Sequence, residues 1–313
     1  MNAINIKDNP VILLTIDVED WFQVENLRSW FPPESWNHQQ LRVEKNTKEI
    51  LDLLDTLKLN TDSGITPKAT FFTLGWIAHR LPNLIREINH RGHEVASHGY
   101  NHLMCNHQSE RELKEDLIRS KKTIEDILGV EVKGYRAPNF SINDRTLELI
   151  RAVGYQYDSS YNNFSKHGRY GIISTHKNVK KGAAILYKGS FAELPISNLN
   201  IGKIILPWGG GGYFRLMPFF VFKIGVFKNI INTGSYIFYM HPWEIDPHQP
   251  KIMGINKFSR WRHYLNLHKT KERLQQLLKT FYCCKYITCS EYLNNLGLAN
   301  NNLTTKAINT SKS

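Results

Sequence analysis

The stretch that decides the fold lies near the amino terminus, where residues 11–22 read VILLTIDVEDWF. Residues 11–16 form a mainly apolar run of strand length, which is typical of a buried strand. Three carboxylates, Asp17, Glu19 and Asp20, follow this run directly. The stretch therefore predicts a buried strand that ends in a group of acidic side chains.

Outward from this strand, β-rich runs alternate with segments whose apolar residues recur at helical spacing. The clearest helix is predicted over residues 109–128, where Gly129 ends it. Further strands are predicted at residues 69–72, 93–97, 132–135, 155–157, 204–206 and 236–240. This alternation predicts an α/β fold of βα units around a parallel sheet. The length of 313 residues allows two domains or one α/β barrel with insertions.

Three later segments depart from this pattern. Periodicity fails over residues 159–201, and an irregular segment of that length is often functional. An apolar helix is expected from Pro218, and a helix carrying Leu274, Leu277 and Leu278 is expected to pack on the barrel. The residues after Leu298 are rich in Asn, Thr, Ser and Lys, so we expect a disordered tail over 299–313.

Composition excludes several classes of protein. Hydrophobic residues make up 41% and charged residues 22%, which is ordinary for a globular chain and excludes a largely disordered or multi-span membrane protein. The net charge of +12 favours an acidic polymer or an anionic membrane surface as partner. No run of five Lys or Arg occurs, and we expect no nucleic acid partner. The amino terminus lacks a signal-like apolar segment and the cysteines lack C-x-x-C spacing, so we expect free thiols and a cytoplasmic protein, peripheral to the inner membrane face.

Unusual polar residues recur where predicted strands end. In a parallel barrel these strand ends lie on one face, where active sites are built. Carboxylates, imidazoles and a guanidinium together suit binding of a divalent metal and transfer of protons. The residues at these ends are Asp17, Glu19 and Asp20, His98 and His102, Arg136, Asp158, and His241.

His98 and His102 form an H-x-x-x-H pair, whose imidazoles can reach a single ion from one side of a turn. A carboxylate from the first strand would complete a set of two histidines and one carboxylate, with positions left for water and substrate. Asp17 and Glu19 are two residues apart and project from the same side of a continuing strand. One can therefore bind the ion while the other acts as a base; the alternative is that both are solvated loop carboxylates.

The glycine run at residues 209–212 lacks the Lys-Ser/Thr of a phosphate-binding loop, so we reject nucleotide binding. We expect a flexible rim there, beside aromatic residues that stack on sugars, with core packing as the alternative. Glu193 is equally compatible with a substrate contact and a structural role. The candidate aromatic platforms are Trp21, Trp208, Tyr213 and Trp243.

Several ordered motifs resemble those of the polysaccharide deacetylases of carbohydrate esterase family 4. The similarity covers about residues 11–298, and the chain looks most like the branch associated with exosortase-linked exopolysaccharide gene clusters. The motifs are TIDVEDWF at 15–22, SHGYNH at 97–102, GYRAP at 134–138, YDSS at 157–160 and YMHPWE at 239–244.

The resemblance implies a distorted (β/α) barrel and a metal-dependent N-deacetylase that carries one divalent ion, which we expect to be zinc. Asp17 matches the family's catalytic base, and His98 and His102 match the metal histidines. Arg136 matches the residue that orients the base, and His241 matches the general acid. From the residues themselves, Asp158 is a candidate to hold the imidazole of His241 in one tautomer, or else a turn former.

Three departures from the common family pattern affect these roles. Val18 stands where the second of two adjacent aspartates binds the metal, so Glu19 becomes the expected ligand and Asp20 the second choice. Gly99 replaces a Ser or Thr, which removes a hydrogen bond to the second histidine. Asn139 replaces the usual aromatic residue after the proline, which leaves its backbone N–H as the candidate oxyanion donor.

By this resemblance, residues 1–257 are the catalytic barrel and residues 258–298 are a C-terminal extension that packs on it. The expected substrate is an acetylated glycan or lipid-linked oligosaccharide whose amino sugars lose their acetyl groups. Two alternatives remain open at this point. One is a cyclic imide or ureide amidohydrolase on the same barrel, and the other is a non-catalytic glycan-binding protein, against which the intact Asp17 and His241 argue.

Overall fold

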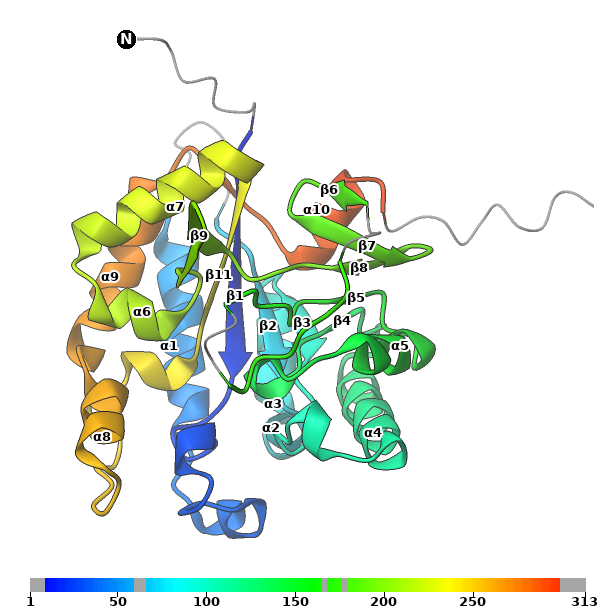
Figure 1. Ribbon diagram of the computed structural model, residues 1–313. Helices are drawn as coiled ribbons and strands as arrows, with labels where there is room; N and C mark the ends of the chain where they lie inside the picture. Colours follow the sequence, from blue (N-terminus) through cyan, green and yellow to red (C-terminus); the bar gives the residue numbers. More distant parts are fainter. Residues whose placement is uncertain (1–8, 59–65, 165–167, 176–178, 299–313) are drawn as a thin grey trace, which may run out of the picture.

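The computed structural model describes residues 9–58, 66–164, 168–175 and 179–298, and the predicted tail at 299–313 lies outside them. A mostly parallel sheet lies at the centre with helices packed around it (Figure 1). The strands are β1 (Val11–Val18), β2 (Ala69–Thr73), β3 (Glu94–Ser97), β4 (Gly134–Tyr135), β5 (Tyr157–Asp158), β6 (Lys180–Lys181), β7 (Ala184–Lys188), β8 (Phe191–Glu193), β9 (Asn198–Ile201), β10 (Ile204–Pro207), β11 (Ser235–Met240) and β12 (Lys285–Tyr286).

Ten α-helices are described in these same ranges, and short 3-10 turns follow several strands. No helix within the described ranges has the length and apolar character to cross a membrane. The helices are α1 (Val43–Thr56), α2 (Gly75–Arg80), α3 (Pro82–His90), α4 (Glu110–Leu128), α5 (Asp144–Ala152), α6 (Gly211–Leu216), α7 (Phe219–Thr233), α8 (Lys257–Tyr264), α9 (Leu267–Thr280) and α10 (Cys289–Asn295). The 3-10 turns are Glu25–Leu27, Pro33–His38, Cys105–His107, Pro138–Phe140 and Pro242–Ile245.

The main sheet runs β11-β1-β2-β3-β4-β5-β8 with every neighbouring pair parallel. The strands β7 and β6 continue it in antiparallel fashion, and β12 pairs with the start of β1. The segment after β8 returns towards the opposite edge, where the backbone N–H of Tyr239 donates to the carbonyl of Gly209 at 2.7 Å. The sheet therefore curls, and the carboxyl ends of its parallel strands face one side, as the α/β prediction requires.

Strand β1 lies inside the sheet, where it pairs with β11 on one side and β2 on the other, and it is buried from Ile12 to Val18. It extends beyond the predicted residues 11–16, so that Asp17 lies within the strand and is paired with Phe72. Alternate β1 side chains face the interior of the curled sheet, where Leu13 packs, or the surrounding helices, where Leu14 packs. Asp17 shares the inner face, which carries it to the end of the barrel interior.

The segment predicted to be irregular, residues 159–201, instead contains β6 to β9. The prediction is wrong for residues 180–201, because the strands there are short and are separated by tight turns at Gly182 and Gly189, both with positive φ, which break any periodic pattern. It holds for the described residues 159–164 and 168–175, which form no helix and only an isolated bridge at Ile172. Strand β8 pairs with β5 and so places Glu193 beside Asp158 at the carboxyl end of the parallel strands.

The glycine run 209–212 leads into α6, and Gly212 lies at the cavity as the expected rim, while its flexibility stays a prediction. Gly210 forms a β-bridge to Tyr239, and a Cβ atom on Gly211 would collide with the carboxylate of Glu244. Glycine is therefore required there for close backbone approach to β11 and to the segment that follows it.

The C-terminal segment is firmly attached to the sheet. Helix α9 buries Leu274, Leu277 and Leu278 in the main core, as predicted, and β12 pairs with β1. The four cysteines carry no disulfide. The division into a barrel at 1–257 and an extension at 258–298 stays a prediction.

Candidate functional site

Three buried side chains converge at the carboxyl end of the sheet. A single oxygen of Glu19, Oε1, lies 3.1 Å from Nε2 of His98 and 2.9 Å from Nε2 of His102. One ligand atom from each residue lies within 4.8 Å of the others. Two imidazole nitrogens and a carboxylate oxygen form a donor set that suits a divalent cation.

The backbone presents these side chains. Glu19 follows β1 and His98 follows β3, while His102 is held with φ of 54° in the left-handed region. Nδ1 of His98 donates to the backbone carbonyl of Arg136 at 2.7 Å, which orients the imidazole so that its Nε2 faces Glu19. Nδ1 of His102 is buried and has no hydrogen-bond partner among the described residues, which agrees with the missing hydroxyl at Gly99.

The electrostatics of Glu19 favour its charged form. Burial raises its pKa, but the charges of His102 and His241 and the hydrogen bonds from His102 and His98 outweigh burial and hold the pKa well below its ordinary value. A buried carboxylate that stays ionised needs a positive partner. The residues present therefore fit a divalent cation, bound by Glu19, His98 and His102.

Asp17 lies beside this cluster in an ion pair with Arg136. Nη1 of Arg136 donates to Oδ1 of Asp17 at 2.7 Å, and both side chains are buried. The guanidinium is fixed further by the hydroxyl of Thr15, by the carbonyl and hydroxyl of Ser159, and by the ring of Phe72, whose centroid lies 4.1 Å from Cζ. These contacts hold the guanidinium of Arg136 in one position on Oδ1 of Asp17. Oδ2 of Asp17 is therefore the oxygen that is free to face the cluster.

His241 faces the cluster from β11 on the other side. Its Nε2 lies 3.7 Å from Oε1 of Glu19 and 4.0 Å from Oδ2 of Asp17. Its Nδ1 donates to Oε1 of Glu244 at 2.8 Å, and Oε2 of Glu244 accepts from Nε of Arg215 at 2.7 Å. A buried chain of Arg215, Glu244 and His241 thus aims the imidazole at Asp17.

This chain sets the protonation of its members. Burial lowers the pKa of His241, but Glu19, Glu244 and Asp17 outweigh it and raise the pKa to about 9. Burial raises the pKa of Glu244, but Arg215 and His241 outweigh it and lower the pKa to about 2. In this arrangement Glu244 is charged and His241 carries a proton that it can deliver.

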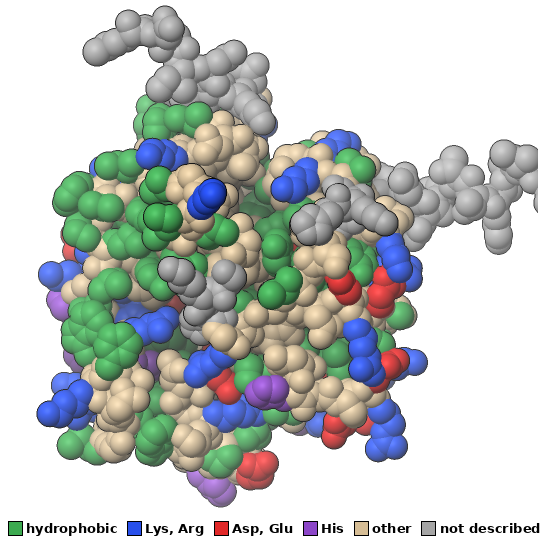
Figure 2. All heavy atoms as spheres, viewed as in Figure 1, with side chains coloured by type: hydrophobic (Ala, Val, Ile, Leu, Met, Phe, Trp, Pro, Cys, Tyr) green, Lys and Arg blue, Asp and Glu red, His purple; other side chains and the backbone are tan. Residues whose placement is uncertain are grey.

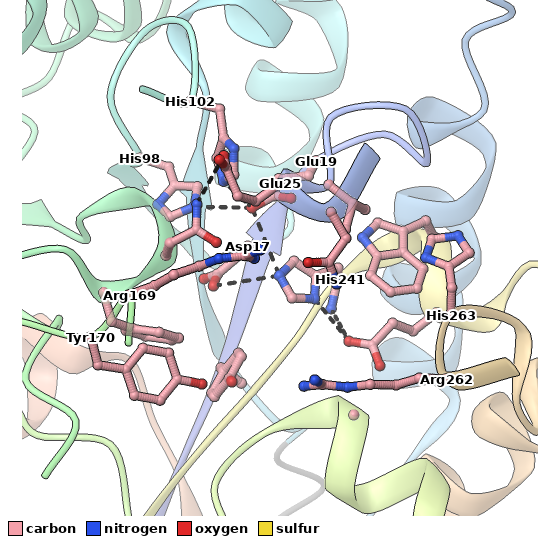
Figure 3. A pocket seen from close by; sticks show the side chains of 18 of the residues that line it. Asp17, Glu19, Glu25, His98, His102, Arg169, Tyr170, His241, Arg262 and His263 are labelled. Carbon is pink, nitrogen blue, oxygen red and sulfur yellow. Dashed lines mark hydrogen bonds and ion pairs between the residues drawn. The ribbon is translucent and has the colours of Figure 1, made fainter. Parts of the chain in front are cut away.

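The cluster lies in a cavity of about 150 Å³. Figure 3 shows Arg169 and Tyr170 entering it from one side, and Arg262 and His263 from the other. Asn139 and Phe140 also line it, and both have positive φ, at 54° and 57°. Non-glycine residues held in this region store strain, which concentrates at functional sites.

Two of the four predicted aromatic platforms line this cavity. Tyr213 is one, and Trp243 is the other, although the ring of Trp243 is sandwiched between His241 and His263. The prediction is wrong for Trp208, which is buried beneath α7, stacked on Phe222 and donates to its carbonyl. It is wrong for Trp21 as well, which packs in a separate aromatic cluster. Their apolar surface is used for core packing.

Asp20 does not join the metal cluster. Its carboxylate accepts hydrogen bonds from the backbone N–H groups of Trp21, Arg42 and Val43, and so ties the start of α1 to the end of β1. Burial raises its pKa to about 6 in spite of these donors. The second choice of carboxylate is thus contradicted, because Asp20 is occupied as a helix-start acceptor.

The predicted contact of Asp158 with His241 is also wrong, since Glu244 makes that contact. Asp158 accepts from the hydroxyl of Ser160 and shares a hydrogen bond with Glu193. Burial and the charge of Asp158 raise the pKa of Glu193 well above its ordinary value. In the loop after β5, the backbone N–H groups of Ser160 and Tyr161 donate hydrogen bonds to Glu193. Glu193 therefore holds this loop in place and has a structural role.

Sequence reasoning missed several residues of the site. Glu244 stands three residues after His241 in the quoted motif, so a capping-box spacing could have found it. Arg215 lies on α6, far in sequence from Glu244, and carries no such signal. The other missed lining residues are Glu25, Arg169, Tyr170, Arg262 and His263.

Fold and site together define an α/β barrel protein with a two-histidine, one-carboxylate centre at the strand ends. Residues 7–157 match the family model of the polysaccharide deacetylases, and residues 159–294 match a domain of unknown function, DUF3473. Residues 7–157 therefore form a domain of the polysaccharide deacetylase family, carbohydrate esterase family 4, and residues 159–294 carry DUF3473 as the C-terminal part. The family predicted from the motifs is confirmed.

Known proteins support this assignment. The chain is 30% identical over 146 residues to a peptidoglycan-N-acetylglucosamine deacetylase of Bacillus cereus, covering 45% of this chain and 64% of that one. It is 30% identical over 131 residues to the peptidoglycan-N-acetylglucosamine deacetylase PgdA of Listeria monocytogenes, covering 42% and 26%. The chain thus spans less than two thirds of the length of these curated relatives.

The fold has a solved counterpart. A crystal structure of a Mycobacterium smegmatis protein assigned as a polysaccharide deacetylase superposes with a TM-score of 0.60 at 20% identity, over 93% of this chain and 92% of that one. The predicted α/β fold of the polysaccharide deacetylase type is confirmed.

Proposed function

We propose that this protein is a metal-dependent hydrolase that removes N-acetyl groups from amino sugars of an exopolysaccharide or of its lipid-linked precursor. The observation that carries the proposal is that Asp17 and His241 converge on the cluster of Glu19, His98 and His102. Nε2 of His241 lies 4.0 Å from Oδ2 of Asp17 and 3.7 Å from Oε1 of Glu19. Hydrolysis of an acetamide needs a base, an acid and stabilisation of the oxyanion. This site offers a candidate for each.

Glu19, His98 and His102 are the proposed ligands of one divalent ion, for which zinc is our choice. When bound, such an ion polarises the acetamide carbonyl and makes water a better nucleophile. The hydrogen bond from His98 to the Arg136 carbonyl keeps the ligand nitrogen of that imidazole correctly oriented.

Asp17 is the proposed general base. The ion pair with Arg136 occupies its Oδ1, while Oδ2 is free to accept a proton from the attacking water. Arg136 acts through Asp17, as a positioning residue.

His241 is the proposed general acid. Its Nδ1 is bound to Glu244, so the proton available for the departing amine is the one on Nε2. Glu244 and Arg215 position this imidazole. Asn139 is proposed to offer its backbone N–H to the oxyanion, from a segment held in a strained conformation at the cavity wall.

The cavity rim supports an acidic or diphosphate-bearing glycan as substrate. Arg169 and Arg262 line it, and neither forms an ion pair with an acidic residue within the described ranges. Tyr213 and Trp243 offer aromatic surface for sugar rings. Cytoplasmic placement, and a place in the exosortase-associated branch, belong to this proposal and rest on the sequence motifs.

A parallel assay tests the function. Purified, zinc-loaded protein is incubated with N-acetylhexosamine oligomers, with their lipid-linked forms and with hydantoin-like rings, and acetate and ring opening are measured. We expect acetate from the acetylated sugars and little ring opening. Ring opening without acetate from any acetylated glycan would favour the cyclic amide hydrolase. Glycan binding without either reaction in the zinc-loaded protein would favour the non-catalytic alternative.

A further inference from the structure

The surface of the chain from residue 194 to residue 271 carries no exposed acidic side chain. Only Glu244 and Asp246 are acidic in this stretch, and both are buried in ion pairs, with Arg215 and Arg42. In Figure 2, hydrophobic and basic side chains mix over α7, whereas acidic side chains gather over α4 and α5. The basic excess of the sequence is therefore uneven on the fold.

Helix α7 lies within this stretch and is apolar on two opposite sides. Phe222, Val226 and Ile230 face the core and are buried. Phe220, Ile224 and Phe227, at spacings of four and three residues, face outward, and Phe220 is 66% exposed. Because a helix on the surface of a globular protein normally turns a polar side to water, the outer side of α7 requires a partner.

Neighbouring elements extend this outer side. The hairpin of β9 and β10 packs against α7 and exposes Ile201 and Ile204 on either side of its turn. Leu216 is exposed at the end of α6, one turn before Phe220. We call the whole set the α7 face, and its members are Ile201, Ile204, Leu216, Phe220, Ile224 and Phe227 with Lys203, Lys223 and Lys228.

We propose that the α7 face docks onto an anionic lipid bilayer. Protruding aromatic and aliphatic side chains flanked by lysines, with no exposed acid, are the composition of a helix that lies in the membrane interface. A second copy of the chain fits less well, because a two-fold contact would bring the same lysines together. A bilayer with negative headgroups satisfies the apolar and the basic side chains at once.

The docking surface adjoins the pocket. Helix α6 carries Tyr213 in the cavity and Leu216 on the α7 face. Helix α8 packs against α6 and carries Arg262 at the cavity rim, and it also exposes Phe258 and Trp261 as an aromatic pair with ring centroids 6.0 Å apart. Resting on the proposed function, this placement would hold the pocket beside the membrane, where a lipid-linked glycan is presented.

Vesicle co-sedimentation tests the proposal. The full chain is mixed with vesicles of 30% phosphatidylglycerol in phosphatidylcholine or of phosphatidylcholine alone. We expect binding to the anionic vesicles that weakens with added salt. Each lysine near an anionic surface contributes about fivefold in affinity, so the Lys223→Glu, Lys228→Glu variant should bind at least about 25-fold more weakly. The Phe220→Ser, Ile224→Ser, Phe227→Ser variant should lose binding as well.

Matched controls use the opposite side of the molecule. Lys114→Glu with Lys122→Glu on α4 makes the same charge change, and Ile118→Ser with Val130→Ser removes exposed apolar side chains of comparable exposure. These controls should bind as the wild type does. Acetate release from a soluble oligomer should be unchanged in the α7 variants, which separates this proposal from the enzymatic one.

Three results would overturn the proposal. They are no binding of the wild type to anionic vesicles, equal loss of binding in the α4 controls, or a dimer in solution that the α7 variants convert to monomer without any vesicle binding. The last result would make the α7 face an interface between two copies of this chain.

Discussion

The two halves of the chain contribute to the site in different ways. Up to β5, strand ends present Glu19, His98 and Asp17 directly, and each is fixed by a backbone position or by Arg136. After β5, a single group, His241, is presented and is held through Glu244 by a buried arginine from a distant helix. The first half thus provides the three candidate metal ligands, and the second half provides His241, the candidate proton donor, and much of the cavity rim.

Their surfaces differ as well. Helices of the first half carry ion pairs between residues four apart, such as Lys48 with Glu44 and Lys122 with Asp126, which balance charge locally. The second half has no exposed acid between residues 194 and 271. Metal binding, proton delivery and docking should therefore be separable by substitution.

The largest effect should come from the ion-binding set of the first half. The His98→Ala, His102→Ala variant leaves Glu19 as the sole remaining ligand of the set, so we expect loss of both bound zinc and acetate release. Metal analysis of the dialysed protein checks this. Asp20→Asn is the control, because the Asp20 carboxylate binds backbone N–H groups and its variant should keep about one equivalent of metal. Unchanged zinc in the double variant would contradict the ligand assignment.

A smaller loss should follow from changing the base or the acid. Asp17→Asn and His241→Ala remove one proton-transfer group each and leave Glu19, His98 and His102 in place. We expect turnover to fall by about a hundredfold or more with zinc content preserved. Steady-state kinetics and metal analysis on the same preparations test the separation of the two halves. Near-normal turnover in either variant would remove that residue from the mechanism.

A milder effect should come from the group that positions the acid. Glu244→Gln removes a negative charge beside His241, so the pKa of His241 falls and its proton is lost at lower pH. The alkaline limb of the rate profile should therefore move to lower pH, with turnover reduced about tenfold. Glu244→Asp, which keeps the charge beside Arg215, is the control and should restore the position of that limb. An unmoved limb at normal zinc content would mean that Glu244 acts on stability alone.

The smallest effect concerns stability, and each half offers a buried histidine for it. Burial and the charges of Lys68 and Arg91 lower the pKa of His93 to about 4, and burial and Arg215 lower that of His263 to about 3. The unfolded chain binds these protons near pH 6.5 and the folded chain does not, so stability falls as the pH falls from 6.5 towards 4. Between pH 7 and pH 5 the free energy of unfolding should fall in both proteins, and in the His93→Asn variant this fall should be smaller than in the wild type by about 1 to 2 kcal/mol. Denaturant unfolding at both pH values measures this, and an equal loss would show that His93 is not buried as a neutral group.

Much of the first half could be predicted from local sequence. The apolar run before Asp17 and the capping signals around 110–128, with Ser109 and Gly129, gave the strand and the helix because burial pattern and end chemistry agree there. His98 and Glu19 could be placed at strand ends because parallel strands bring those ends to one face.

The second half could be predicted less well. Trp208 and Tyr213 flank the same glycine run, yet the first fills the core under α7 and the second lines the cavity. Nothing in their local sequence distinguishes them, because burial is decided by elements that pack from elsewhere in the chain. The strands β7 and β8 were missed for the same reason, since the pairing of β8 with β5, and of β7 with β8, outweighs their weak local pattern.

The fold class, the H-x-x-x-H pair and the kind of chemistry follow from local sequence, because these depend on strand and helix periodicity and on residue type. The role of each carboxylate is visible only in the folded chain. There Asp20 is bound to the start of α1, Asp158 to Glu193, and Glu244 to His241. A carboxylate ionises and positions its neighbours according to the donors around it, and those donors come from other elements of the fold, such as Arg42 for Asp20 and Arg215 for Glu244.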